Sequence, residues 1–521
     1  MSRYDIVVIG GGLNSLVTAS ILGKSGKKVL VLEARDQLGG LATTSEFTSG
    51  FKCNMINDTV KWVDPRIIKQ LNLESHGLIL HSPDLVRIAL GENGQHISFY
   101  RDPNQTAGSI ANFSKKDAKE WKSFTEYITN LTHFLEKLYE LTPPELPNIG
   151  FKEAISMRAM LSPIWRHGTR GLTDFMRVAP MMMPELMDEW FENTLLRSAV
   201  STAGIHHLSF GPFSAGTGYN LLHQHVQSDG VFHNTKFIKG GTGQFANALK
   251  LSAESVNVEI RTNVSVSDIN VEGDVCSGVT LESGETIQAN QVVSGLDPQN
   301  TFINLVGPSK LNPTFATQLR NIKYRGSTAR IHFALNALPE IKGVTEDQMG
   351  TVFSASPSIE YLERTSDSVK YGRLAEDPYV EFSIPSVINP EFAPDGKHVL
   401  SATVQYAPYH LRDQVWSSEL NEQIKNNVVR VLDNYIPDFS SLIEVTSVLS
   451  PKDLEDKFGL TEGNLNHGEM TLDQFFFMRP TMSAAQYKSP IENLYLCGSG
   501  THPGGGLHGT NGFNAAREIL K

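Results

Sequence analysis

The sequence predicts an α/β protein with a Rossmann-like nucleotide-binding domain and a second, α+β domain built on a mostly antiparallel sheet. Three observations support this prediction. A short apolar run leads into consecutive glycines near the N-terminus, a second glycine cluster precedes the last helical stretch, and alternating strand patterns lie between them. The nucleotide-binding segments are far apart in the chain, so we expect that domain to be discontinuous.

The first elements are a strand, a glycine turn and a helix. Residues 4–9 form a short, mostly β-branched apolar run, typical of a buried parallel strand, and a helical pattern covers residues 13–26. Between them, Gly10 allows a tight turn, and Gly12 lets a pyrophosphate approach the amides at the positive end of the helix. Ser15 replaces the usual third glycine and is small enough for helix and strand to pack closely.

A second strand, over residues 28–32, ends in Glu33. This carboxylate falls about 20 residues past the glycine turn, where the ribose hydroxyls of a dinucleotide need an acceptor. A glycine loop that merely turns the chain is the alternative, but strand, turn, helix, strand and acid in this order favour dinucleotide binding and redox chemistry. A 2′-phosphate is disfavoured because Glu33 would repel it.

Length and composition indicate an ordinary folded protein of about two or three domains. A net charge of −11 disfavours nucleic acid as a partner and broad attraction to anionic lipid. The three cysteines form neither a C-x-x-C pair nor a ligand cluster, which favours a reducing cytoplasm. No apolar stretch reaches about 18 residues, and the strand at residue 4 leaves no room for a signal peptide, so we expect no transmembrane segment and no secretion.

The next segments predict a hairpin and a long helix. Strand-like runs over residues 85–90 and 96–100 flank the turn at 91–94, and apolar residues recur at helical spacing from Trp121 to Leu138, before Pro143. Residues 175–190 hold five methionines and two prolines. Such a surface could line a tunnel for a long apolar substrate or touch a membrane peripherally; we favour an ordinary packed helix pair.

The nucleotide-domain pattern returns with glycines 240–243 and a helix through Leu251, then strand-like runs at 258–266, 274–281 and 285–293. No suitably spaced acid follows these glycines, so we expect a turn that supports the helix rather than a phosphate loop. Alternating strands at 328–335, 379–384 and 398–405 suit an antiparallel sheet. We therefore expect a nucleotide-binding domain over residues 1–80, 236–300 and 485–521, and a substrate domain over 81–235 and 301–484.

The C-terminal stretch is a strand at 493–497, a glycine-rich run and a helix from about Leu507 to Leu520. A helix N-terminus at this place suits the anionic N1 and C2 carbonyl region of a reduced flavin, whereas a nicotinamide cofactor has no obvious need for it. The sequence therefore favours FAD, with no separate NAD(P)H site.

Four motifs carry a family resemblance: residues 9–12, 33–43, 240–243 and 497–506. Together they resemble the phytoene-desaturase-like family of FAD-dependent oxidoreductases over nearly the whole chain, and residues 459–469 and 474–480 point to one branch of it. The resemblance implies a two-domain flavoprotein related to carotenoid desaturases, carotenoid isomerases and, more distantly, amine oxidases.

The resemblance also implies cofactor contacts. Some of the contacting residues would face the pyrophosphate and the adenosine, including the backbone of Val264, and the others would hold the ribityl chain and the flavin ring. The residues are Gly10, Gly12, Leu13, Asn14, Ser15, Glu33, Ala34, Arg35, Gly40, Leu41, Ala42, Thr43, Val264, Gly498, Ser499, Gly505, Gly506 and Leu507.

The expected reaction is hydride transfer from a substrate C–H to flavin N5, with the protein supplying orientation and a dry pocket. The resemblance suggests desaturation or dehydrogenation of an apolar isoprenoid or polyene, with oxygen or a quinone as electron acceptor. Redox-neutral isomerisation, oxidation of a C–N bond and non-catalytic flavin binding stay open. His502 and Arg479 are candidates for contacting substrate or flavin; His502 capping a turn and Arg479 pairing with a carboxylate are the alternatives.

Five histidines, between His206 and His233, are close in sequence but have no i, i+4 pair at ligand spacing and no nearby cysteines. We expect scattered surface or hydrogen-bonding histidines there and no metal site.

Overall fold

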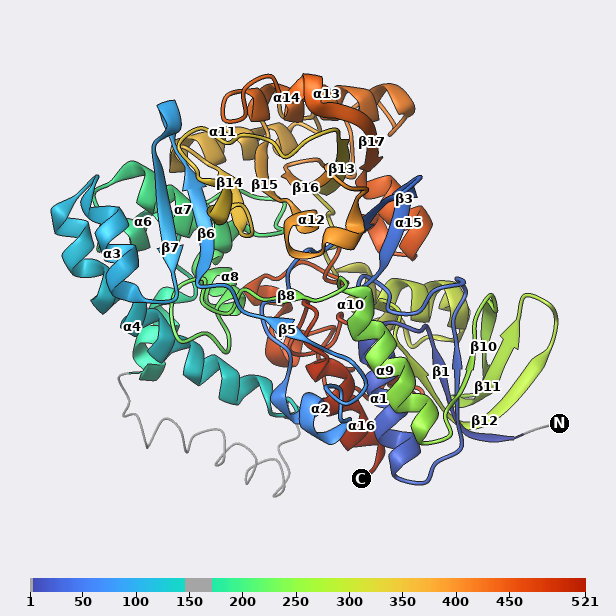
Figure 1. Cartoon of the computed structure of the whole chain (residues 1–521). Coiled ribbons are helices and arrows are strands. Elements are labelled where there is room, and N and C mark those ends of the chain that lie inside the picture. The colour runs from blue at the N-terminus through green and yellow to red at the C-terminus, as the bar shows by residue number, and fades with distance from the viewer. Residues whose placement is uncertain (1–2, 146–170) are drawn as a thin grey trace.

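The structure is a computed structural model that describes residues 3–145 and 171–521. The protein has two seven-stranded sheets, each with its own core and with helices around it. In the view of Figure 1, the sheet with β13 and β16 is at the top and the sheet with β1 and β12 is at the lower right. This arrangement confirms the predicted fold class.

The first sheet is the predicted Rossmann-like unit, with strand order β10-β11-β12-β1-β2-β9 and β18 beside β12. Its neighbouring strands β1 and β12 are parallel although they lie far apart in the chain, so the domain is discontinuous. The strands are β1 (Tyr4–Ile9), β2 (Val29–Leu32), β9 (Glu259–Arg261), β10 (Val266–Glu272), β11 (Val275–Leu281), β12 (Thr286–Ser294) and β18 (Leu494–Leu496).

Both faces of this sheet are covered, as the continuous apolar character of β1 requires. Ile6 and Val8 pack under the helices α1 (Leu13–Lys24), α9 (Gly243–Ser255) and α16 (Thr510–Ile519). Val7 and Ile9 pack on the opposite side, with the π-helical segment Gln299–Val306 and α10 (Pro313–Arg320). The core of the first sheet thus continues to Leu319. We propose that the domain boundary expected at residue 300 lies near residue 320; the other predicted bounds stay predictions, and residues 1–2 and 146–170 of those ranges lie outside the described residues.

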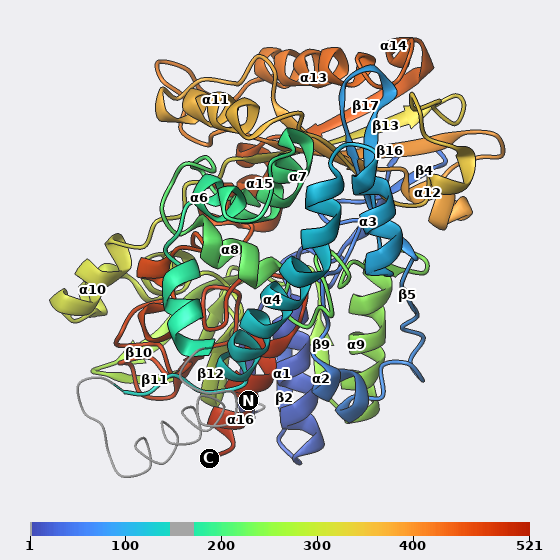
Figure 2. The same cartoon turned by 90° about the vertical axis from the view of Figure 1, so that its left-hand side faces the viewer.

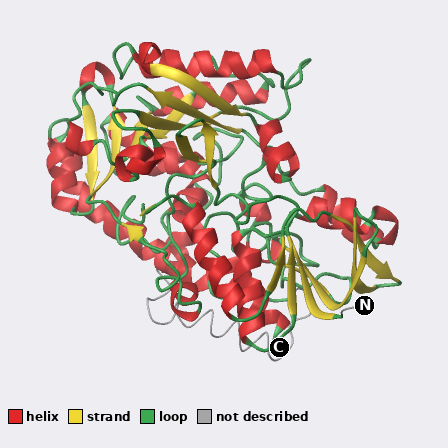
Figure 3. Cartoon of the chain, turned by 45° about the vertical axis from the view of Figure 1, so that its right-hand side comes forward, coloured by secondary structure: helices red, strands yellow, loops and turns green. Residues whose placement is uncertain are grey.

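The second sheet has the order β17-β13-β16-β15-β14-β6-β7. In Figure 3 the strands of the two seven-stranded sheets form two yellow groups, and both termini lie beside the lower one. All neighbouring strands of the second sheet are antiparallel except β6 and β14, which confirms the mostly antiparallel prediction. The strands are β6 (Leu85–Leu90), β7 (His96–Tyr100), β13 (Thr328–Leu335), β14 (Val352–Ala355), β15 (Tyr379–Ser383), β16 (His398–Gln405) and β17 (Ile443–Leu449). Helix α13 (Ser418–Asp433) covers one face through Ile424, Val428 and Val431.

A helical layer lies beside the second sheet: α3 (Pro103–Ala111), α4 (Lys115–Tyr139), residues 171–178, α6 (Met183–Asp188), α7 (Thr194–Ile205) and α8 (Thr217–Gln224) (Figure 2). Trp121, Phe124, Met183 and Met187 are buried in one core there. The methionine-rich segment therefore packs as a helix pair, as we favoured, although Met176 is exposed.

The remaining elements are short. They are α2 (Pro65–Gln70), α11 (Ile359–Lys370), α12 (Pro385–Ile388), α14 (Phe439–Leu442) and α15 (Pro451–Phe458), with β3 (Thr44–Thr48) pairing β4 (Phe51–Asn54) and β5 (Leu80–His81) pairing β8 (Phe237–Ile238). Across the described ranges, no helix is both long and apolar enough to cross a bilayer.

Candidate cofactor and substrate site

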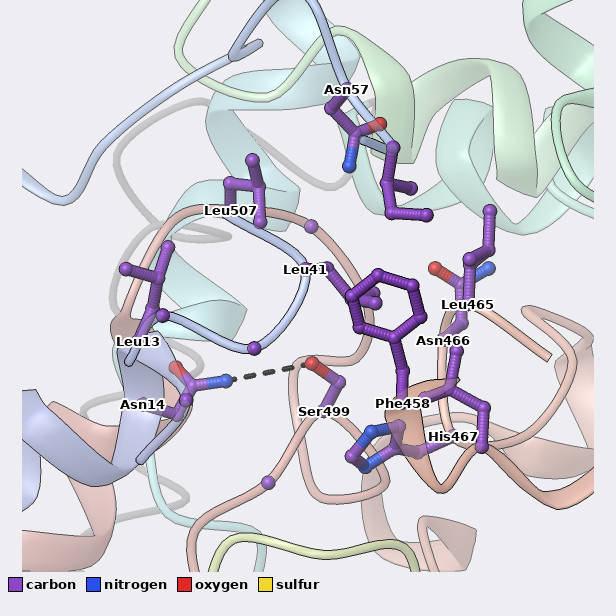
Figure 4. A pocket seen from close by; sticks show the side chains of 18 of the residues that line it. Leu13, Asn14, Leu41, Asn57, Phe458, Leu465, Asn466, His467, Ser499 and Leu507 are labelled. Atoms are coloured by element: carbon purple, nitrogen blue, oxygen red, sulfur yellow. Dashed lines mark hydrogen bonds between the residues drawn. The ribbon is translucent and has the colours of Figure 1, made fainter. Parts of the chain in front are cut away.

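One cavity of about 620 Å³ runs from the glycine turn of the first sheet to the inner face of the second sheet. Its lining comes from segments throughout the chain, from Ile9 to His508. Figure 4 shows side chains of α1, of the loop after α15 and of the C-terminal glycine run meeting around it. A cavity of this size suits an organic cofactor, whose pockets commonly measure about 300–1,000 Å³.

The glycine turn leaves an open cradle at one wall. Gly10 has φ +86°, a conformation that favours glycine. Gly12 precedes α1 without a side-chain cap, so the first amides of this helix are available to an anion. A Cβ added to Gly12 would meet no atom within 4 Å. The space that a phosphate needs beside this backbone is therefore present.

Ser15 fits its place because the opposite residue is small. A Cβ at Gly295 would lie 2.0 Å from the Ser15 Oγ, so Gly295 provides the room that a third glycine usually gives. The Ser15 hydroxyl also lies 3.8 Å from the Cys497 sulfur. Close packing of helix and sheet is preserved despite the departure from the usual motif.

Glu33 lines the cavity at the end of β2, as its predicted role requires. Its Oε2 accepts a hydrogen bond of 2.6 Å from the Gly11 amide, and its Oε1 accepts one of 3.0 Å from the Arg35 amide. Each carboxylate oxygen keeps a second lone pair for a ligand hydroxyl. The backbone amide of Val264 donates to the Glu33 carbonyl, so Val264 lies at the same end of the cavity.

The segment after Glu33 divides into lining and supporting residues. Ala34, Arg35, Gly40 and Leu41 line the cavity, whereas Ala42 and Thr43 do not. The Thr43 hydroxyl instead donates to the Gly40 carbonyl at 2.7 Å, and Ala42 is buried. The predicted direct contacts of Ala42 and Thr43 thus have no support in the geometry.

The C-terminal run closes the opposite wall with Gly498, Ser499, Gly505, Gly506 and Leu507. The side-chain amide of Asn14 donates to the Ser499 Oγ at 3.5 Å (Figure 4). This contact joins α1, near the N-terminus, to the glycine-rich run near the C-terminus. Leu13 and Asn14 also line it.

The last helix starts later than expected, at Thr510 rather than Leu507. Gly506 and Gly509 have φ of +127° and +75°, which keeps this stretch out of the helix and brings it to the cavity wall. The Thr510 amide donates to His508 Nδ1, and the Thr510 hydroxyl donates to Asp64. The amide and the hydroxyl of Thr510, the first residue of α16, are therefore occupied within the protein, and the role of this helix end beside the flavin stays a prediction.

The Gly-Gly-Thr-Gly turn at residues 240–243 lies outside the cavity lining. The Thr242 amide donates to Asn54 Oδ1 at 2.9 Å, and the Gly243 amide donates to Thr44 Oγ1 at 3.0 Å. These amides are occupied within the protein, which agrees with a turn that supports α9.

The inner end of the cavity is polar, which the sequence analysis did not anticipate. Its residues come from the loop before α2, the end of α7 and the strands β13, β15 and β16, so no local pattern reveals them. They are Asn57, Asp58, Thr59, Lys61, His206, His207, Arg330, Glu381, Ser383, Ser401 and Thr403, with Val352 and Phe382 as apolar neighbours.

Two buried ion pairs organise this polar end. Arg330 Nη2 lies 2.7 Å from Asp58 Oδ2, which also accepts from the Ser383 hydroxyl at 2.9 Å. Arg87 Nη2 lies 2.7 Å from Glu381 Oε2, behind the cavity wall. Burial would raise the pKa of the Glu381 carboxyl, but the charge of Arg87 holds the pKa below its usual range. Each of the two carboxylates is thus paired with an arginine of the protein.

The two catalytic candidates, His502 and Arg479, lie outside the cavity lining. Arg479 is buried, and its guanidinium donates to the carbonyls of Asn466, Gly468, Glu469, Gln474 and Ser499. His502 Nε2 lies 3.1 Å from the Leu138 carbonyl, and burial lowers the pKa of its imidazole to about 3. The geometry thus supports positioning roles, and Arg479 binds backbone carbonyls rather than the carboxylate of our alternative.

The five histidines are buried or partly buried rather than on the surface. His206, His207 and His223 line the cavity, and His223 Nε2 lies 2.9 Å from the Gly505 carbonyl. In the described part of the chain, no three His, Cys, Asp or Glu side chains are arranged to hold a metal ion.

Comparisons of the sequence with known proteins identify related families. The model of the flavin containing amine oxidoreductases matches residues 16–520. Pyridine nucleotide-disulfide oxidoreductase domain-containing protein 2 of Rattus norvegicus is 31% identical, over 100% of this chain and 94% of its own. A lycopene-forming phytoene desaturase of Paracoccus sp. is 25% identical, over 97% of this chain and 95% of its own.

The fold has relatives among solved structures as well. An oxidoreductase from Methanosarcina mazei superposes with a TM-score of 0.61 at 15% identity, over 100% of both chains. FAD is thus the cofactor of this oxidoreductase, and the cradle at Gly12 and the acceptor at Glu33 fit it. The chain belongs to the flavin containing amine oxidoreductase family, in a phytoene-desaturase-like branch.

Proposed function

We propose that this FAD-dependent oxidoreductase is a dehydrogenase or desaturase, which removes a hydride from a substrate C–H at the inner end of the cavity. The observation that carries the proposal is the continuity of that cavity. Its nucleotide end is built by the first sheet, and its polar end by the second sheet, so cofactor and substrate would meet inside one continuous space.

The residues that would hold FAD are those of the predicted set that line the cavity. Gly10, Gly12, Leu13, Asn14, Ser15, Glu33, Ala34, Arg35, Gly40, Leu41, Val264, Gly498, Ser499, Gly505, Gly506 and Leu507 form this set. FAD, when bound, supplies the hydride acceptor. The protein would contribute the orientation of the two partners and the exclusion of water.

Two observations support different features of the substrate. Phytoene desaturases among the relatives support an apolar, isoprenoid-like skeleton that carries the reacting C–H. The polar inner wall supports at least one charged or hydrogen-bonding group, because a wholly apolar substrate would leave the ammonium group of Lys61, which has no hydrogen-bond or ion-pair partner among the described residues, buried without one. We therefore propose an apolar skeleton with a polar group at one end, and oxygen or a quinone as the electron acceptor.

Redox-neutral isomerisation, amine oxidation and flavin binding without turnover are the competing functions. Anaerobic mixing of the oxidised holoenzyme with substrate tests them. A dehydrogenase should lose the oxidised flavin absorption as product forms, and recover it when oxygen or a quinone is added. An isomerase should instead turn over only after prior reduction, with no net electron transfer.

Mass spectrometry can identify the substrate class. Molecules extracted from the purified holoenzyme should include an apolar compound with a polar end group. Such a compound should bleach the flavin, whereas an amine that bleaches it with release of an aldehyde would establish C–N oxidation instead. A flavin that cannot be reduced by any extract and does not reoxidise after photoreduction would contradict the proposed activity.

A further inference from the structure

One cation at the inner end of the cavity has no partner. Lys61 lines the cavity, and no described residue forms a hydrogen bond or an ion pair with its ammonium group. No carboxylate oxygen of these residues lies within 4.0 Å of its Nζ. A cation in such a place is stabilised best by an anion that arrives from outside the protein.

The neighbouring charges leave Lys61 uncompensated. Asp58 is paired with Arg330, and Glu381 is paired with Arg87. The inner end thus has three cations, which are Lys61, Arg87 and Arg330. It has two carboxylates, which are those of Asp58 and Glu381. The inner end of the cavity has one excess positive charge when its histidines are neutral.

The histidines are neutral at physiological pH. Burial lowers the pKa of the His206 imidazole to about 4 and holds that of His207 well below its usual range. The two rings lie 3.8 Å apart at the cavity wall. His207 Nδ1 is 3.1 Å from the Thr328 hydroxyl, whereas the imidazole ring of His206 forms no hydrogen bond with any described residue. His206 therefore offers a neutral N–H donor beside Lys61.

We infer that Lys61, assisted by His206, binds the carboxylate of an otherwise apolar substrate or product at the inner end of this cavity. The inference rests on the proposed function and specifies its polar end group. One excess charge matches a carboxylate better than a phosphate dianion. A lysine suits a single anionic oxygen, whereas planar bidentate recognition would favour an arginine, and both arginines here are already paired.

Binding of three ligands with one alkyl chain tests this inference. Octanoate, octanol and octylamine are titrated into the holoenzyme, and dissociation constants are measured by calorimetry and by the change in flavin absorption. Octanoate should bind at least ten-fold more tightly than either of the others. Equal binding of octanoate and octanol, or preference for octylamine through Glu381, would overturn the inference.

Variants of Lys61 assign the preference to this side chain. Lys61→Met should abolish the preference for octanoate, while Lys61→Arg should keep it. Lys236→Met is the matched control, because Lys236 is also partly buried but lies outside this cavity, at a separate hollow. It should leave the preference unchanged. If Lys61→Met does not fold, an Arg variant that loses the preference contradicts the inference on its own.

The pH dependence gives a second readout. The charged and titratable groups that interact electrostatically with Lys61 are Glu381, Arg87, His206, His207 and His225. Burial lowers the pKa of the Lys61 ammonium group to about 8. Octanoate stays ionised while Lys61 loses its proton, so its affinity should fall as the pH rises through about 8. Lys61→Arg should remove that decrease, because arginine stays charged. An unchanged decrease in Lys61→Arg would contradict the assignment.

The experiments distinguish failure of the carboxylate site from failure of the proposed dehydrogenase function. Octanoate binding requires no turnover and is measured with oxidised flavin present. Selective octanoate binding without any flavin reduction would retain the carboxylate site and reject the dehydrogenase. Flavin reduction by neutral substrates, with no preference for octanoate, would do the reverse.

Discussion

At the scale of one residue, Gly12 has room for a larger side chain in the protein without FAD, but we expect that room to be filled by the pyrophosphate when FAD is bound. Its φ of −68° suits any residue, and a Cβ there meets nothing within 4 Å. Gly12→Ala should therefore fold with unchanged apoprotein stability. The new methyl group would project into the phosphate cradle, so the dissociation constant of FAD should increase roughly ten-fold or more. Flavin fluorescence titration of the apoprotein measures it.

Gly108→Ala is the matched control for this substitution. Gly108 lies in α3 with open space around the position of an added Cβ and no positive φ, and it is not part of the cavity lining. It should bind FAD like the parent protein and gain roughly 0.5–1 kcal/mol of stability, because alanine favours a helix over glycine. Equal FAD affinity in both variants would mean that the pyrophosphate does not approach Gly12.

Single residues also show what the sequence could predict. Gly12 and Glu33 were found because their roles depend on short spacings along the chain. The hydrogen bonds of Arg479 could not be predicted, because only the fold brings the carbonyls of residues 466–474 and of Ser499 together around its guanidinium group. Lys61 looks ordinary in the sequence, and only the packing of distant segments leaves it unpartnered.

At the scale of elements, the turn before α9 combines backbone conformation with close packing. Gly241 has φ +89°, and an added Cβ would lie 2.4 Å from Thr44 Oγ1 and 2.6 Å from Asn54 Oδ1. Gly284 has φ +87° with nothing within 4 Å of its Cβ. Both substitutions to alanine should cost about 1–3 kcal/mol for backbone strain, and Gly241→Ala should cost more because of the clash.

Thermal and urea unfolding of the two variants compare these costs. A larger destabilisation of Gly241→Ala, with unchanged flavin absorption, would support a turn that holds α9 against β3 and β4. Equal destabilisation of the two would contradict this close packing. Weaker flavin binding in Gly241→Ala at unchanged stability would instead indicate the phosphate loop that we reject.

Elements with strong local patterns were predicted closely, and elements defined by tertiary contacts were not. The strands β6, β7, β13 and β16 have the bounds expected from their alternation. β14 has four residues and β17 is half-exposed at the edge beside β13, so neither has a strong pattern of its own. The start of α16 depends on glycine conformations after Gly505, which a helical pattern does not reveal.

At the scale of the molecule, one cavity unites the two termini, the central segment and both sheets. The nucleotide half could be predicted because its motif is one continuous unit of strand, turn and helix with short, recognisable spacings. The polar half could not, because Asp58, Lys61, His206, Arg330 and Glu381 come from separate elements that meet only in the folded chain. Their charges are the reason why we propose an apolar substrate that carries one polar end group.

This long-range assembly predicts that the whole length of FAD is needed to stabilise the protein. A ligand that binds only the folded state at 100 times its dissociation constant adds about 2.7 kcal/mol. FAD should therefore raise the unfolding temperature, and FMN at equal concentration should raise it less, because it lacks the adenosine expected between Glu33 and Val264. Hydrogen exchange should show protection of residues 33–35 and 259–266 by FAD alone, and of residues 498–508 by both flavins. If FMN protects and stabilises as well as FAD, the cavity end at Glu33 does not hold the adenosine.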